Sequence, residues 1–495
     1  MAVSGEPFPV RFAVAGRAVS SGVLYLADSR GRFVPLPLRA GQSVWSGGAA
    51  LLGQVPASTV HGQHLRYYAV FHDSETGQTI TVPAAGAAHP RQVWVVSRPV
   101  EVRLGRHRFG ALTAPDAVVA RVDANGVGWD APREGAAHGP SSFEIAPDRA
   151  VWLLDEMNRR LLGWRPDTPN HPATVVPLPV TAADFALGPN GTFYLTAAGT
   201  PAEKTMVLYS ITADGRVRWR ALLATDLFNA KLRMGPDRVL YDVTDTGWIP
   251  VATAGGAPLS VADQHRRIQA HQPTAGGGRL VVTYASPRDA RIAVLDVTGR
   301  PIRAWRVTGD TDMAPPDAAL PTLVNGNPVV PFDLFEAKPW KLEQLAVRLT
   351  ASGAPVRVRL DNTIWGDKPT TEYRTGPDGA FYQLQTSRTT GVKIVRYGLD
   401  TRTPRPTVSG HAGVATPTTA ADPAASVDPA STATALPTTP QAKPGTHPPS
   451  TRQVFSSVLI GAGGIGLAVV VTMGTALLLR RRRHQPWRPP HAGQR

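Results

Sequence analysis

The densest group of polar side chains in the first 400 residues lies in the run "LLDEMNRRLL". It contains Asp155, Glu156, Asn158, Arg159 and Arg160. Carboxylate and amide oxygens are ligands for divalent cations, so the first three side chains are candidates to hold a metal ion. Alternatively, Asp155 and Asn158 cap backbone N–H groups in a tight turn, with Arg159 paired to a carboxylate. We favour the turn. Asp155, Glu156, Asn158 and Arg159 are therefore kept only as candidates for binding, with no residue assigned to catalysis or to a metal.

Other chemistries have less support. The chain has no cysteine, which excludes disulfides, thiolate metal sites and cysteine nucleophiles. His265 and His271 are six residues apart, which is not the spacing of a metal-binding pair on a helix, and we expect both in surface loops. No nucleophile elbow and no phosphate-binding loop occurs. The sequence predicts no cofactor and favours a protein that is not an enzyme, although enzymatic activity stays open.

The net charge of +15 does not indicate nucleic-acid binding. Six of the positive charges lie in the last 16 residues, and the other arginines are scattered. A nucleic-acid-binding domain gathers basic residues on one face or helix. We therefore expect no nucleic-acid partner.

The elements that must position the polar run repeat along the chain. A turn rich in Gly, Pro, Asp and Asn, followed by a short apolar strand, occurs six times, with turn residues at 147, 189, 236, 277, 326 and 377. The clearest copies are "APDRAVWLLD", "GPNGTFYLTA", "GPDRVLYDVT" and "GPDGAFYQLQ". A period of about 40 to 50 residues is typical of propeller blades, each a four-stranded sheet. The repeat predicts a six-bladed β-propeller over 110–400, an all-β fold.

The last unit of the repeat lacks an outer strand, and "DAVVARVDANGVGWD" at 116–130 is predicted to supply it, which would close the ring. The run "FEIAPDRAVWLLDEMNRRLLGW" at 143–164 resembles NHL-type six-bladed β-propellers. It has a Pro-Asp turn, a strand ending in Asp155, and then Asn158 and Arg159 before the next strand. Arg149 stands where that family has glycine. The resemblance implies an architecture and no particular function.

Propeller lactonases hold a metal ion with Glu, Asn and Asp from several blades, and those positions are not matched in this sequence. An extracellular, metal-dependent lactonase-like hydrolase remains the alternative function. Trp152, Trp164, Trp219 and Trp305 recur near strand ends. We expect them to pack the blades, with carbohydrate stacking as the alternative.

Residues 1–100 lack the repeat. Short strand-like runs alternate with hairpin turns at Ser29-Arg30-Gly31 and Glu75-Thr76-Gly77. About seven strands in this length predict an immunoglobulin- or fibronectin-like β-sandwich, a common spacer or binding module.

The C-terminal part has a different composition. Residues 401–453 contain 10 Pro and 12 Thr and no aromatic residue, which predicts a disordered Pro/Thr/Ala stalk. Residues 454–479 carry no charge over 26 positions, which predicts a transmembrane helix. The tail 480–495 begins with Arg480, Arg481, Arg482 and Arg483, a stop-transfer signal that predicts a cytoplasmic C-terminus. "LPTTP" in the stalk resembles a sortase signal, but Pro440 replaces the required glycine.

These segments predict a single-pass cell-membrane protein whose helix contacts lipid and whose head lies outside the cell and binds a protein or glycan. Residues 1–30 contain no signal peptide, which conflicts with that orientation. Either the true start lies upstream and a signal peptide is missing, or the protein is tail-anchored with a cytoplasmic head. The stalk and the arginines favour the first.

Overall fold

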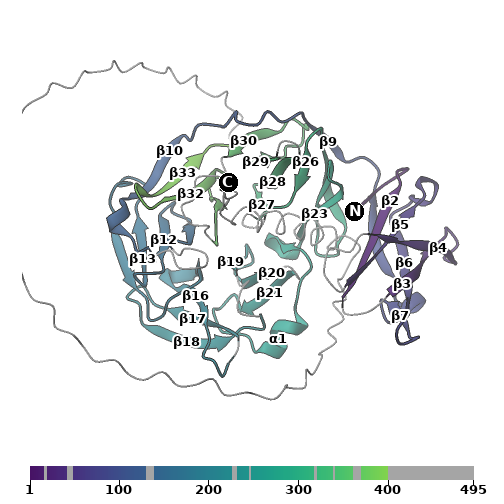
Figure 1. Ribbon diagram of the computed structural model, residues 1–495, viewed down its shortest axis with the longest axis horizontal. Coiled ribbons are helices and arrows are strands. Elements are labelled where there is room, and N and C mark those ends of the chain that lie inside the picture. The colour runs from purple at the N-terminus through teal and green to yellow at the C-terminus, as the bar shows by residue number, and fades with distance from the viewer. Residues whose placement is uncertain are drawn as a thin grey trace, which may run out of the picture. The chain divides into compact units, whose positions relative to one another are not determined.

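The computed structural model describes residues 1–399 except 16–18, 42–47, 130–138, 204, 226–230, 245–246, 317–319, 338–339 and 361–369. The regular secondary structure of the described chain is almost entirely β-strand, and six small sheets form a ring, a six-bladed β-propeller (Figure 1). This confirms the predicted architecture. The predicted stalk 401–453, membrane span 454–479 and tail 480–495, with Arg480–Arg483, lie outside the described residues. Within the described part of the chain, no helix combines the length and the apolar character that crossing a membrane requires.

The first three blades follow one another along the chain. Blade 1 is formed by β11 (Ser142–Ile145), β12 (Val151–Asp155), β13 (Arg160–Trp164) and β14 (Thr174–Pro177). Blade 2 is formed by β15 (Asp184–Leu187), β16 (Phe193–Ala198), β17 (Met206–Ile211) and β18 (Val217–Leu222). Blade 3 has three described strands, β19 (Leu232–Met234), β20 (Leu240–Thr244) and β21 (Gly247–Ala252), followed by α1 (Val261–Arg266).

Of the other three blades, blades 4 and 6 each include one strand from the start of the propeller sequence. Blade 4 is formed by β22 (Gln272–Pro273), β23 (Arg279–Ser286), β24 (Asp289–Leu295), β25 (Pro301–Gly309) and β9 (Val100–Gly105). Blade 5 is formed by β26 (Asp312–Ala314), β27 (Thr322–Val324), β28 (Asn327–Ala337), β29 (Trp340–Arg348) and β30 (Val356–Leu360). Blade 6 is formed by β31 (Tyr373–Thr375), β32 (Phe381–Ser387), β33 (Gly391–Tyr397) and β10 (Ala117–Val122).

Each of the six repeated turns leads into one strand of a different blade, as the period predicts; these strands are β12, β16, β20, β23, β28 and β32. Every one contains a residue with positive φ: Arg149, Asn190, Arg238, Gly276, Asn325 and Gly379. Arg149, at the position where glycine was expected, has φ 68°, so the turn geometry is kept although the residue type is not. In three turns an aspartate accepts a hydrogen bond from the N–H two residues later, namely Asp148, Asp237 and Asp378. The residue types required by these turns therefore produce the repeat of about 40 to 50 residues in the sequence.

Ring closure occurs as predicted. Strand β10 pairs antiparallel with β33, so a segment from the start of the propeller completes the last blade (Figure 1). Strand β9 adds to blade 4 in parallel with β25. We call the segment from β9 to β10, residues 100–122, the clasp. It joins blades 4 and 6 and thereby spans blade 5.

Side chains of blade 5 hold the middle of the clasp. Arg357 donates to the carbonyls of Leu104 and Arg103, at 2.8 and 2.7 Å. Glu343 accepts a hydrogen bond from the backbone N–H of Gly110, and its other oxygen lies 2.6 Å from Nε2 of His107. The clasp is therefore hydrogen-bonded to all three blades that it crosses.

The predicted tryptophan packing is confirmed for all four residues, because Trp152 and Trp219, although only partly buried, also pack against clusters that join neighbouring blades. Trp164 and Trp305 are fully buried, each in a hydrophobic cluster that joins neighbouring blades. Trp152 makes an edge contact with Phe193 of blade 2, with ring centroids 4.8 Å apart. Apolar residues between blades thus provide the main packing of the ring.

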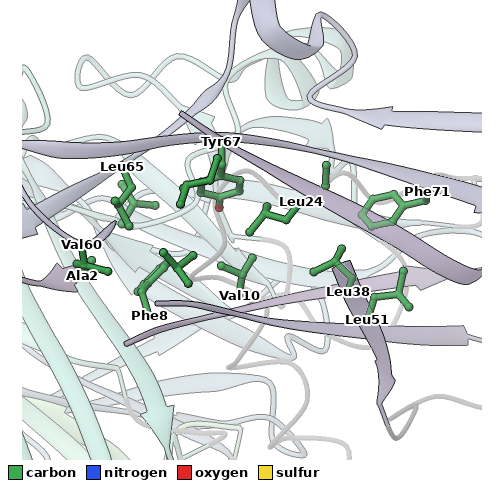
Figure 2. Packing of buried hydrophobic residues seen from close by; sticks show 14 of the residues in the cluster. Ala2, Phe8, Val10, Leu24, Leu38, Leu51, Val60, Leu65, Tyr67 and Phe71 are labelled. Carbon is green, nitrogen blue, oxygen red and sulfur yellow. The ribbon is translucent and has the colours of Figure 1, made fainter. Parts of the chain in front are cut away.

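Residues 1–96 form a separate set of strands. These are β1 (Ala2–Val3), β2 (Phe8–Ala15), β3 (Val19–Ala27), β4 (Phe33–Gly41), β5 (Gly48–Val55), β6 (His64–Asp73), β7 (Thr79–Val82) and β8 (Arg91–Val96). The predicted hairpin glycines Gly31 and Gly77 have φ 81° and 67°. Figure 2 shows Leu24, Tyr67 and Phe71 facing Phe8, Val10 and Leu51 across one apolar core. The eight strands are hydrogen-bonded into one sheet in the order β1-β8-β6-β3-β4-β5-β2, with β7 beside β6, and they share this core. The immunoglobulin-like topology stays a prediction.

A substitution at the centre of β10 tests ring closure. Ala120 is 2% exposed and packs with Phe143 and Ile394. Ala120→Asp would bury a carboxylate among apolar side chains. We therefore expect it to lower the free energy of unfolding by ~3 kcal/mol. Arg121→Ala, at the neighbouring exposed side chain, is the control and should change it by less than ~0.5 kcal/mol. Thermal denaturation and protease cleavage within residues 106–122 measure both variants. Equal behaviour of the two would contradict a closing role for β10.

Candidate functional site

The polar run singled out from the sequence forms the turn between β12 and β13. Asp155 is fully buried, and its carboxylate accepts hydrogen bonds from the N–H of Gly128 (2.9 Å), Nδ2 of Asn158 (2.9 Å) and Nε of Arg160 (2.8 Å). The turn interpretation predicted an arginine partner at Arg159. The structure instead pairs Arg160 with Asp155, while Arg159 is exposed with φ 49°.

The turn is fixed from two sides. Arg160 also donates to the carbonyl of Gly126, 2.7 Å away, in the loop that follows β10. Gly128 in that loop lies so close that an added Cβ would be 2.6 Å from Cβ of Met157. The turn of blade 1 is thus held against the loop that follows β10, the strand that closes blade 6. Met157, Asn158 and Arg159 remain exposed on this rigid support.

A second polar group lies on, or just before, the inner strands β11, β15, β19 and β31 of blades 1, 2, 3 and 6. We call it the axial cluster: Ser142, Glu144, Asp184, Arg233, Thr371 and Arg374. Asp184 at the start of β15 accepts from Ser142 of blade 1 and, at 3.1 Å, from Nη1 of Arg233 of blade 3.

Thr371 connects the cluster to blade 6. Its hydroxyl accepts from Nη2 of Arg233 at 3.2 Å and from Nη2 of Arg374 at 3.1 Å. Arg374 in turn pairs with Glu144 of blade 1 at 2.8 Å. Charged side chains of alternating sign therefore link blades 1, 2, 3 and 6.

The turn and the axial cluster lie at the same end of the ring. Glu156 accepts from the hydroxyl of Ser141 at 2.9 Å, and Ser141 immediately precedes Ser142 of the cluster. The carbonyl of Ser141 also accepts from the N–H of Thr371 at 3.0 Å. The candidate residue Glu156 is thus linked through Ser141 to the axial cluster, whereas the hydrogen bonds of Asp155 stay within the turn and the loop after β10.

Burial changes the protonation of two groups in this region. It lowers the pKa of Arg233 to about 10, aided by the nearby charge of Arg374, so the guanidinium is still charged at neutral pH. Burial raises the pKa of Asp242 on β20 to about 6, although the hydroxyl of Thr225 and the N–H of Lys231 donate to its carboxylate. Blade 3 therefore contains a carboxyl group that titrates close to physiological pH.

The proposed metal ligands are engaged with protein groups. The carboxylate of Asp155 receives three protein donors, and Asn158 donates its amide to Asp155. Across the part of the chain that the structure describes, no group of three or more His, Asp or Glu side chains is placed to hold a metal ion. The carboxylates of the axial cluster are likewise paired with arginines.

The two singled-out histidines are not both in surface loops, so that prediction was wrong in part. His265 is exposed, but it lies in the last turn of α1. His271 directly precedes β22 and is partly buried, where burial, the amino group of Met1 and Arg279 lower its pKa to about 4.

Sequence reasoning missed the axial cluster. A signal was present: Glu144, Arg233 and Arg374 each stand three residues before a repeated turn position, at 147, 236 and 377. A charged residue on an inner strand of a propeller faces its counterparts in other blades, which a reading of single motifs does not reveal. The repeat register, rather than any local motif, would have identified it.

No protein-family model matches the chain, and no curated protein matches it. Among solved structures, it is similar to virginiamycin B lyase from Staphylococcus aureus, with 11% identity, a TM-score of 0.26 and coverage of 79% of this chain and 99% of the other. It is also similar to a puromycin hydrolase, with 16% identity, a TM-score of 0.27 and coverage of 76% and 58%. These likenesses are too distant to assign a function.

The protonation of Asp242 gives a pH-dependent prediction. Its pKa rises from the usual 3.8 to about 6 on folding, so the folded chain binds the proton more tightly than the unfolded chain. This contribution to stability is complete below about pH 4 and is lost as the pH rises through 6. Relative to Asp242→Asn, the wild-type protein should lose up to ~3 kcal/mol of unfolding free energy between pH 4 and 7. Denaturation of both proteins across this range measures the difference, and parallel pH profiles would contradict it.

Proposed function

We propose that the chain is a single-pass, membrane-anchored surface protein whose propeller head binds a protein or glycan partner. The helix 454–479 would hold it in the lipid bilayer, and residues 401–453 would act as the stalk. The N-terminal strands, for which we propose an immunoglobulin-like topology, would serve as a spacer.

The observation that carries the binding role is the rigid turn between β12 and β13. Asp155 makes three hydrogen bonds inside the protein, while the neighbouring Met157 is 39% exposed and Arg159 is also exposed. Methionine and arginine are enriched at protein interfaces, and a preorganised support lowers the entropy lost on binding. The partner would therefore meet Met157, Asn158 and Arg159.

The hydrolase alternative has less support. A lactonase-like reaction needs carboxylate or amide oxygens that converge on one metal ion. The described carboxylates of the axial cluster are directed at arginines, and Asp155 is directed at Arg160. This arrangement favours a structural role for these side chains over a catalytic one.

A photo-crosslinking amino acid at position 157 tests the binding surface on intact cells. We expect a discrete crosslinked species from position 157 that is lost when Arg159→Glu is added. Position 297 is the control, because Val297 is 73% exposed on the β24–β25 hairpin and lies outside the turn. A glycan partner would instead appear as binding of the purified protein to a glycan array that Arg159→Glu abolishes. The same crosslinks from positions 157 and 297 would contradict the proposal.

Protease treatment of intact cells tests the orientation. If the head lies outside the cell, added protease should remove it without lysis. If the head survives until the cells are lysed, the protein is tail-anchored and the partner must be sought in the cytoplasm. A cytoplasmic protein blotted in parallel reports whether the cells stayed intact.

A further inference from the structure

A cavity of about 590 Å³ lies away from the turn and the axial cluster. One wall is formed by β8 with the residues before it, and the other by blade 4 with the segment from 268 to 271 that leads into it. This volume is in the range of sites that bind small organic molecules.

Direct contacts hold the two walls together. The carboxylate of Glu6, in the N-terminal strands, pairs with Arg306 at 2.6 Å and with Arg291 at 3.2 Å, both in blade 4. Strand β9, which follows β8 in the chain, is hydrogen-bonded to β25 of the same blade. The cavity is therefore a formed part of the folded chain.

The lining combines apolar walls with positive charge. Val281 and Ala293 form a buried apolar side, and Trp94 and Pro301 add further apolar surface. The polar side is formed by His89, Arg91, His271 and Arg279. Among the described residues that line the cavity, no aspartate or glutamate occurs. An excess of positive charge beside an apolar wall complements a ligand that is apolar and anionic.

The fixed charges are the two arginines. His271, with its lowered pKa of about 4, is neutral at pH 7 and offers a hydrogen bond rather than a charge. Arg279, the first residue of β23, is exposed and forms no ion pair with any described residue. A carboxylate matches the two parallel N–H donors of a guanidinium.

We propose that this cavity binds a small organic acid with an apolar body and a single carboxylate. The apolar body lies against Trp94, Val281 and Ala293, and Arg279 holds the carboxylate. The site is independent of the partner proposed for the turn at 155–160, so the failure of either proposal leaves the other standing.

Calorimetric titration of the full-length protein with 3-phenylpropanoate tests the proposal, with 3-phenylpropanamide as the neutral analogue of the same shape. We expect the acid to bind, and the amide to bind at least tenfold more weakly because it lacks the charge. Arg279→Ala should raise the Kd of the acid about tenfold and leave that of the amide nearly unchanged. Trp94→Ala should weaken both ligands, because it removes apolar contact area from each.

Arg303→Ala is the matched control, because Arg303 is an exposed arginine of the same blade that does not line the cavity. It should bind the acid as the wild-type protein does. Equal affinity for acid and amide, an unchanged Kd in Arg279→Ala, or no binding of the acid at millimolar concentration would each overturn the proposal. Because Arg279 is exposed, its substitution should not unfold the protein, and thermal denaturation of the variant checks this.

Discussion

The pairing of β10 with β33 is the interaction on which the propeller depends. Each blade is a small sheet that is marginal by itself, and it is stabilised by apolar contacts with the next blade. A ring of such units gains the final contact only when its ends are joined. The clasp provides this joint, and its contacts with blades 4, 5 and 6 fix the ring at several points. The axial cluster depends on ring closure, because Arg233, Thr371 and Arg374 come into contact only when blades 3 and 6 face each other.

The axial cluster favours one arrangement of the blades but adds little to the stability of the ring. Burying Arg233 with Asp184 costs desolvation energy that pairing only partly offsets, so such a pair contributes little net stability. The pair forms only when both side chains are correctly placed, however. A charged side chain left without its partner is costly, so a ring in the wrong register is penalised more than the native ring. The cluster therefore favours a unique arrangement of the inner strands, while the apolar clusters between blades provide the bulk of the stability.

The sequence predicted the architecture well because turns are local. Asp148, Asp237 and Asp378 act within their own turns, so the period could be read without knowing any long-range contact. The closing strand was also predictable, because the last repeat unit lacked an outer strand and residues 116–130 had a strand-like pattern.

The candidate site was harder to predict from the sequence. Asp155 was identified, but its partners include Gly128, whose N–H approaches from another blade, and the choice of Arg160 over Arg159 depends on backbone conformation. The cavity at His271 is also lined by β8, some 180 residues away in the chain. No local sequence pattern predicts that these two segments lie side by side.

The place where the described chain leaves the propeller has a mechanical consequence. Strand β33 is not an edge strand, because it lies between β32 and β10 in blade 6. The residues that follow it are held as well: Leu399 is 1% exposed and its carbonyl accepts from Arg348 of blade 5, while the N–H of Gly398 donates to Asp116 in the clasp. A pulling force applied through the chain beyond Leu399 would load two hydrogen-bonded ladders at once instead of peeling one strand from an edge. The fold is thus built to resist tension applied at Leu399, the last described residue of the propeller.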